Sequence, residues 1–181
     1  MTTSPTGASA QPIGSGSGLD RWNALPADEA ERELAACCAS TAWVRAVVSG
    51  RPYRDLGAVL DASAAAFAEL ADADVDEALA AHPRIGERAA GSSREAAWSR
   101  QEQSGAADAD APTTAALAAG NRAYEQRFDR VFLICATGLS AAQMLAALEA
   151  RLGNDDATER AVVRTELAKI AALRLERMLA G

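Results

Sequence analysis

Apolar residues recur at three- and four-residue intervals along most of this chain, and this spacing limits the possible folds more than any other feature. Such spacing places side chains on one face of an α-helix. Hydrophobic residues make up 49% of the chain and aromatic residues only 4%, so alanine, leucine and valine supply the apolar bulk. Alanine and leucine favour helices, and the sequence therefore predicts an all-α protein. The clearest run is Leu56, Val59, Leu60, Ser63, Phe67 and Leu70.

The same pattern predicts a single-domain bundle of about eight helices over residues 19–181. Residues 1–18 consist mostly of Ser, Gly, Thr, Pro and Ala and cannot bury enough apolar surface to fold, so we expect a disordered tail. A short extended segment is expected near 131–136, because this apolar run has β character but no partner strand. It either begins a helix or directs its backbone groups to something else, such as a ligand.

Composition argues against several classes of function. The net charge of -7 argues against a nucleic-acid partner, because such proteins present a basic surface to phosphates. No apolar run reaches the roughly 18–20 residues of a membrane span, and the first residues lack the pattern of a secretory signal. Cys37, Cys38 and Cys135 have no metal-ligand spacing and only one histidine to join them. We therefore expect free thiols, no metal site and a cytoplasmic protein.

The stretch from His82 to Gln103 holds the first candidates for chemistry. His82 is the only histidine and precedes Pro83, which biases it out of a helix and onto a stiff corner. A histidine titrates near neutral pH, which suits general acid–base catalysis. The alternative is a surface loop histidine without a role.

Glu102 is expected on a helix that begins at a Ser92–Glu95 capping box, runs to about Gln103 and stops at Gly105. Two interpretations of this residue stay open. Ser99 and Glu102 have the spacing of a capping box, which would leave Glu102 as an ordinary exposed glutamate. Alternatively, the neighbouring Trp98 could desolvate the carboxyl group, raise its pKa and suit it to proton transfer.

Arg174 falls in the middle of an apolar stripe on the last predicted helix, 158–179. A guanidinium that faces a core is costly unless a carboxylate or an anionic ligand pairs with it. The alternative is that Arg174 lies at the edge of the stripe and extends to water. No phosphate-binding loop, dinucleotide fingerprint or nucleophile elbow is present. Three other arginines are expected on solvated faces: Arg160, Arg164 and Arg177.

Several motifs in a fixed order carry a resemblance to a known family. They are CCAS at 37–40 with Trp43, HPRIGE at 82–87, SRQEQSGA at 99–106, FLICATG at 132–138, RLGN at 151–154 and KIAALRL at 169–175. Together they make residues 19–181 resemble OHCU decarboxylases. Members of this family convert 2-oxo-4-hydroxy-4-carboxy-5-ureidoimidazoline (OHCU) to (S)-allantoin in urate breakdown.

The resemblance implies an all-α carboxy-lyase that needs no cofactor, takes OHCU as its substrate and forms a homodimer. It assigns catalysis to His82 and Glu102. It assigns substrate contacts to Pro83, Ser99, Gln103, Phe132, Leu133, Ile134 and Arg174, with 132–134 acting through the backbone.

The chain departs from the family pattern at 129–131. Many members read FGFPF where this chain has Phe128-Asp129-Arg130-Val131-Phe132, so the local backbone path is expected to differ.

Two other classes of function stay open. One is a non-catalytic helical module that dimerises or binds partner helices, and the other is a cofactor-free ureide hydrolase.

Overall fold

Helices provide all the regular structure in the computed structural model, which describes residues 18–87, 92–107 and 109–180. The all-α prediction is confirmed. The described residues form ten helices rather than about eight, and two of these are short, with seven residues in α1 and four in α7. The helices are α1 (Gly18–Ala24), α2 (Ala27–Ala35), α3 (Thr41–Ser49), α4 (Leu56–Glu69), α5 (Asp72–Ala80), α6 (Arg94–Glu102), α7 (Ser104–Ala107), α8 (Ala111–Phe128), α9 (Ala141–Arg151) and α10 (Asp156–Leu179).

Local sequence sets where these helices begin. Asp55 accepts a hydrogen bond from the Ala58 N–H at 2.8 Å and so caps α4, and Asp155 caps α10 through the Thr158 N–H at 2.7 Å. A side-chain oxygen at this position satisfies one of the free N–H groups of the first turn. The predicted cap of α6 is off by one residue, because Ser93 and not Ser92 accepts from the Ala96 N–H.

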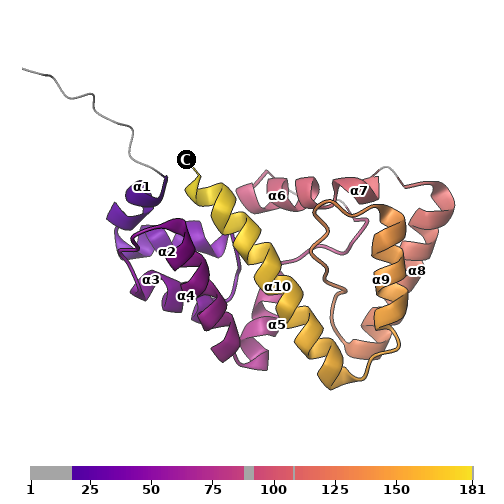
Figure 1. Ribbon diagram of the computed structural model, residues 1–181. Coiled ribbons are helices and arrows are strands. Elements are labelled where there is room, and N and C mark those ends of the chain that lie inside the picture. Colours follow the sequence, from indigo (N-terminus) through magenta and orange to yellow (C-terminus); the bar gives the residue numbers. More distant parts are fainter. Residues whose placement is uncertain (1–17, 88–91, 108, 181) are drawn as a thin grey trace, which may run out of the picture.

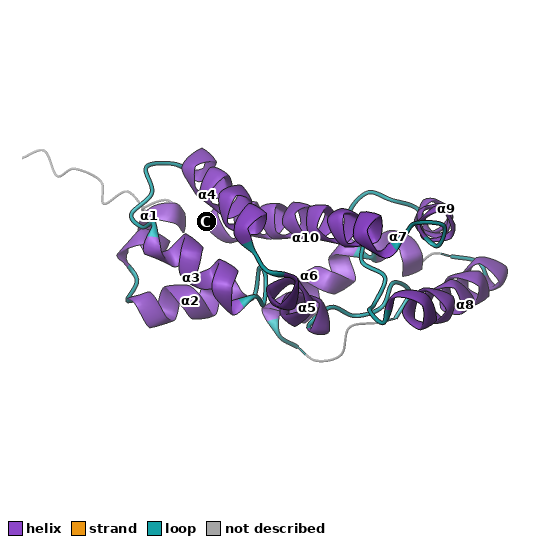
Figure 2. Ribbon diagram, turned by 90° about the horizontal axis from the view of Figure 1, so that it is seen from below, coloured by secondary structure: helices purple, strands orange, loops and turns teal. Residues whose placement is uncertain are grey.

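The long helix α10 runs diagonally through the molecule and divides it into two parts (Figure 1). Helices α1 to α4 lie on one side of α10, and α8 and α9 lie on the other. Helices α6 and α7 lie across one end of this arrangement. The view from below shows the same separation of α8 and α9 from the N-terminal helices (Figure 2).

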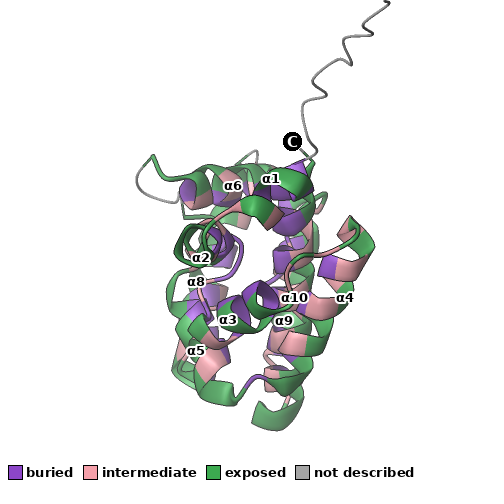
Figure 3. Ribbon diagram, turned by 90° about the vertical axis from the view of Figure 1, so that its left-hand side faces the viewer, coloured by how far each residue is buried: buried purple, intermediate pink, exposed green. Residues whose placement is uncertain are grey.

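Two hydrophobic clusters fill these two parts. The first cluster includes Trp22 and Trp43 and joins α1 to α5 with α10. The second includes Tyr124 and joins α8 and α9 with residues 132–136. The buried helix faces are turned inward, and exposed residues cover the outside (Figure 3).

Residues 131–136 are neither helix nor strand, which confirms the short extended segment. It lies between the α8–α9 pair and α10 (Figure 1). The N-terminal tail predicted at 1–18 lies almost entirely outside the described residues. Of the helices that the structure describes, none combines the length and apolar character needed to cross a membrane.

Candidate active site

His82 lies two residues beyond the end of α5, on the non-helical corner that the following proline predicts. Its Nδ1 is 2.9 Å from the carbonyl oxygen of Ala78. Because a carbonyl can only accept, Nδ1 carries the proton in this contact and Nε2 keeps its lone pair. Nε2 is buried and has no hydrogen-bond partner among the described residues. Burial, reinforced by the nearby Arg174 charge, lowers the pKa of His82 to about 4, so the ring is neutral at pH 7.

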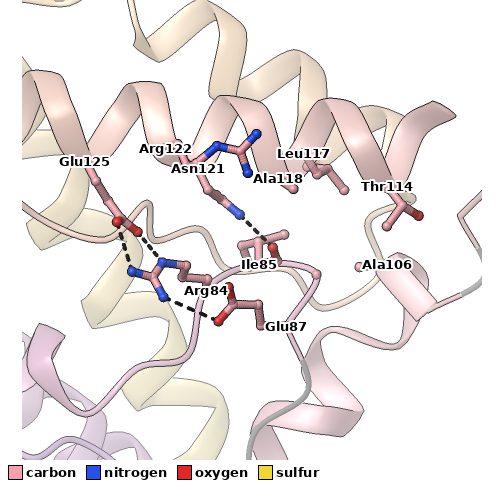
Figure 4. A pocket seen from close by; sticks show the side chains of 11 residues that line it. Arg84, Ile85, Glu87, Ala106, Thr114, Leu117, Ala118, Asn121, Arg122 and Glu125 are labelled. Carbon is pink, nitrogen blue, oxygen red and sulfur yellow. Dashed lines mark hydrogen bonds and ion pairs between the residues drawn. The ribbon is translucent and has the colours of Figure 1, made fainter. Parts of the chain in front are cut away.

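The loop that follows His82 is fixed to α8 and α6 by hydrogen bonds. Asn121 is buried on α8 and donates from Nδ2 to the Ile85 carbonyl at 2.8 Å (Figure 4). The Gly86 N–H donates to Oε1 of Gln103 at 3.1 Å, and the φ of Gly86 is +85°, a conformation that favours glycine. A cavity of about 320 Å³ lies between this loop and α8.

The same loop also carries a surface ion pair. Arg84 binds Glu125 through two hydrogen bonds of 2.5 and 3.0 Å, and a second carboxylate, Glu87, lies 3.5 Å from its guanidinium (Figure 4). The loop directly after His82 and Pro83 is therefore held by contacts with α8 and with Gln103 at the end of α6.

Helix α6 supplies Ser99 and Glu102 from one buried face. Glu102 is 7% exposed, so the interpretation as an exposed capping residue is wrong. Ser99 lies inside the helix and binds an arginine instead of capping a helix end. The predicted end of this helix at about Gln103 is confirmed, because α6 ends at Glu102 with Gln103 as its C-cap. Gly105 does not stop it, because Gly105 lies inside the separate short helix α7.

Arg174 is 1% exposed, and two nitrogens of its guanidinium bind the Glu102 carboxylate. Nε lies 3.0 Å from Oε1 and Nη2 lies 2.8 Å from Oε2, while Nη2 also donates to the Ser99 hydroxyl at 3.1 Å. A two-point contact of this kind is strong and orients both groups. Of the two interpretations of Arg174, the buried guanidinium paired with a carboxylate is confirmed.

Arg177 also binds the Glu102 carboxylate, with Nη1 3.1 Å from Oε1, so its assignment to a solvated face is wrong. The sequence contained a usable signal, because Arg177 lies three residues after Arg174 and so projects from the same side of α10. Arg164 is misassigned in the same way. It donates to the carbonyl oxygens of Phe67 at 3.0 Å and Leu70 at 2.7 Å.

The extended segment supplies three residues to the site, two predicted ones and Ala136. Leu133 and Ile134 line the same cavity as His82. Phe132 does not line it, because its ring packs in the second cluster, 5.2 Å from the centre of the Tyr124 ring. Only a backbone role remains open for Phe132.

The backbone groups of this segment meet side chains rather than a strand. The Leu133 carbonyl accepts from Arg151 at 2.7 Å, and the Cys135 N–H donates to Glu166 at 2.8 Å. Among the described residues, none accepts a hydrogen bond from the N–H groups of Leu133 or Ile134.

These groups surround one small cavity of about 20 Å³, room for roughly one water molecule. Eight of the nine predicted site residues line it, all except Phe132. Five further lining residues were missed, and only Ile170 had a signal, since it lies one helical turn before Arg174 on the predicted stripe. The cavity is lined by His82, Pro83, Ile85, Ser99, Glu102, Gln103, Leu133, Ile134, Ala136, Thr137, Ile170, Leu173 and Arg174.

The departure from the family pattern at 129–131 is accommodated locally. Asp129 closes α8 in the left-handed conformation, with a φ of 52°, and its N–H donates to the Glu125 carbonyl at 2.9 Å. Aspartate tolerates this conformation better than most residues. Arg130 then binds Asp156 at 2.8 Å.

The three cysteines are free, as predicted. Burial raises the pKa of Cys37 to about 12 and that of Cys38 to about 11, so both are protonated at neutral pH. Within the described ranges, no group of three or more His, Cys, Asp or Glu side chains is placed to hold a metal ion.

The fold and the site together define an all-helical protein in which a neutral histidine lines a cavity beside a buried carboxylate–arginine pair. The family model for OHCU decarboxylases matches residues 23–176. The chain belongs to the OHCU decarboxylase family.

Two relatives and two solved structures place the chain further. It is 35% identical over 134 residues to the 2-oxo-4-hydroxy-4-carboxy-5-ureidoimidazoline decarboxylase of Amia calva, across 72% of this chain and 76% of the relative. It is 33% identical over 151 residues to the uric acid degradation bifunctional protein TTL of Arabidopsis thaliana. That match covers 82% of this chain but only 47% of the plant protein, so the chain spans about half of its length.

The structure is similar to a crystal structure of OHCU decarboxylase in the presence of (S)-allantoin. The TM-score is 0.72 and the identity 28%, over 82% of this chain and 98% of the other. A crystal structure of (S)-allantoin synthase matches with a TM-score of 0.68 over 89% of this chain and 54% of the other. Its 17% identity supports the shared fold alone.

Proposed function

We propose that this protein decarboxylates OHCU to (S)-allantoin in urate degradation. The observation that carries the proposal is the buried cavity that His82, Glu102 and Arg174 line together, in a chain of the OHCU decarboxylase family. The names of its relatives, a decarboxylase of this substrate and a uric acid degradation protein, support the same substrate.

The reaction needs groups that move protons and groups that hold negative charge. The bond between the ring carbon and its carboxylate breaks, CO₂ leaves, and the ring takes up the electron pair. A proton from solvent neutralises the ring nitrogen that received this pair, and the hydroxyl on the carbon loses its own proton and becomes a carbonyl. A proton then reaches the adjacent ring carbon, and the face from which it arrives sets the chirality of allantoin.

His82 is suited to accept the hydroxyl proton, because its ring is neutral and Nε2 has no partner among the described residues. Glu102 is the second acid–base group and acts on the proton of the ring carbon. Its two arginine partners hold the carboxylate in one orientation.

Arg174 and the N–H groups of Leu133 and Ile134 would hold the anionic part of the substrate. Donors placed in advance around developing negative charge stabilise a transition state. Because the cavity has room for only one water, the substrate must separate some of the lining groups. The remaining substrate contacts in this proposal are Pro83, Ser99, Gln103 and the backbone of Phe132.

A kinetic assay tests the activity. OHCU is produced in situ from urate, and the circular dichroism of the product is followed with and without the protein. The substrate decays spontaneously to racemic allantoin, so catalysis appears as a faster reaction and an optically active product. We expect His82→Asn and Glu102→Gln to lower kcat/KM about 10²–10⁴-fold, the usual contribution of an acid–base group. Glu69→Gln, an exposed glutamate on α4, is the matched control.

If the wild-type protein follows the slow racemic course of buffer, the proposed function is wrong. Cleavage of the ureide without CO₂ release would instead identify a hydrolase.

We also propose a homodimer in the cytoplasm that uses no cofactor, following the family resemblance. Sedimentation of the purified protein tests the dimer, and activity after dialysis against chelator tests the need for a metal.

A further inference from the structure

A second buried ion pair contacts the extended segment and does not line the site cavity. Arg151, the last residue of α9, is 8% exposed, and Glu159, in α10, is fully buried. The Arg151 Nε lies 2.8 Å and Nη2 2.5 Å from Oε1 of Glu159. Neither residue lines the site cavity, so neither can be a catalytic residue in this state of the protein.

Other donors satisfy the Glu159 carboxylate. The Tyr124 hydroxyl donates to Oε1, and Nδ2 of Asn154 donates to Oε2 at 2.8 Å. Burial raises the pKa of Tyr124, which keeps its hydroxyl protonated and able to donate. The RLGN motif thus has a physical role, because its first and last residues, Arg151 and Asn154, both bind Glu159.

The remaining arm of Arg151 reaches the extended segment. Its Nη1 donates to the Leu133 carbonyl at 2.7 Å, and its guanidinium lies 4.6 Å from the centre of the Phe132 ring. Glu166 holds the segment two residues further on, through the Cys135 N–H. The backbone between these two points supplies Leu133 and Ile134 to the cavity.

The direction of the Leu133 carbonyl determines the direction of the next N–H. A trans peptide is planar, and its C=O and N–H point to opposite sides. When Arg151 draws the Leu133 carbonyl towards itself, the Ile134 N–H must point away from Arg151. Ile134 lines the cavity and Arg151 does not, which is what an N–H directed towards the site requires.

We propose that Arg151 and Glu159 are positioning residues that fix the Leu133–Ile134 peptide so that its N–H binds the anionic part of the substrate. This rests on the proposed function. Arg151 acts through its hydrogen bond to the Leu133 carbonyl. Glu159 acts by binding Nε and Nη2 of Arg151, which orients the guanidinium so that Nη1 reaches the Leu133 carbonyl.

The test compares a double variant, Arg151→Met with Glu159→Gln, against the wild type. Removing both charges together avoids leaving one of them buried and unpaired, which would itself strongly destabilise the protein. The Leu133 carbonyl then has no donor. We expect the variant to keep its helical circular dichroism. Its kcat/KM for OHCU should fall about ten- to a hundredfold, as a small misplacement of a binding group does, and its allantoin should lose optical purity.

A second variant, Arg151→Lys, decides the question if the double variant does not fold. Lysine keeps a positive charge beside Glu159 but lacks the fork that reaches two partners. Arg164→Met is the matched control, because Arg164 also donates to two backbone carbonyls but lies outside the site cavity. We expect the control to lower stability and leave kcat/KM unchanged.

The positioning role is wrong if a folded double variant, or Arg151→Lys, keeps kcat/KM within about threefold of the wild type and makes optically pure product. A purely structural role predicts that result together with a lower melting temperature. Absence of turnover in the wild type would overturn the proposed function instead, so the two failures are distinguishable.

Discussion

The single histidine makes the stability of this protein depend on pH in a way that can be calculated. Unfolded His82 titrates near its ordinary pKa of 6.5, whereas burial lowers its pKa in the folded protein to about 4. The unfolded chain therefore binds a proton between these values that the folded protein does not. The contribution that neutral, buried His82 makes to the free energy of unfolding is fully present above pH 6.5 and is lost as the pH falls towards 4.

The size of the effect follows from the two pKa values. Between pH 7.5 and pH 5, protonation of unfolded His82 should lower the free energy of unfolding by about 2 kcal/mol, and about 3 kcal/mol is the limit below pH 4. The chain has no other histidine, so the remaining titrations in this range come from carboxyl groups near its acid end.

Urea unfolding at pH 7.5 and pH 5 measures this difference in the wild type and in His82→Asn. The variant keeps the carboxyl groups and loses the imidazole, so it reports the background. We expect the wild type to lose about 2 kcal/mol more than the variant over this range. Equal losses in both proteins would refute the assignment of a buried, neutral His82.

Three further substitutions test the supports of the site. Glu102→Gln leaves Arg174 buried without a carboxylate, so urea unfolding should show a loss of about 3–5 kcal/mol, and a loss below 1 kcal/mol would contradict the buried pair. Asn121→Leu removes the donor to the Ile85 carbonyl and should cost about 1–3 kcal/mol and lower kcat/KM, whereas unchanged kinetics would show that this bond does not position the loop. Gly86→Ala places a side chain at positive φ, although the space around it is open, and should raise the unfolding rate and cost about 1–2 kcal/mol; equal stability would mean that the loop adopts another conformation.

The sequence predicted the helices well because their signals are local. Apolar spacing, a capping side chain and a proline all lie within a few residues of the boundary they determine. The same reasoning placed the α6 cap at Ser92, one residue early, since two adjacent serines offer equivalent hydroxyls. Only the backbone path decides which of them meets the Ala96 N–H.

A site residue could be predicted where its side chain did not fit the pattern of its sequence neighbours, and could not be predicted where it did fit. Arg174 was recognisable because a charge interrupts an apolar stripe. Its partner could not be derived, because Glu102 lies 72 residues away in sequence and its spacing from Ser99 fits an ordinary cap equally well. Family resemblance, rather than spacing, selected Glu102.

The tautomer of His82 and the anchoring of Leu133 could not be predicted from any pattern. The first depends on the Ala78 carbonyl and the second on Arg151, and both contacts arise only when the helices pack. Burial likewise excluded the Phe132 side chain from the cavity, although its sequence neighbours line it.

Helix α10 carries one member of each buried ion pair, Glu159 near its beginning and Arg174 near its end. The regular geometry of α10 therefore fixes the angle about the helix axis between the Glu159 and Arg174 side chains. Each residue turns an α-helix by about 100°. An insertion or deletion of one residue between the two positions would rotate Arg174 away from Glu102 while Glu159 kept its partners, even though every side chain of both pairs was still present. The length of the stretch between Glu159 and Arg174 is therefore fixed by the two ion pairs, independently of the contacts that its own side chains make.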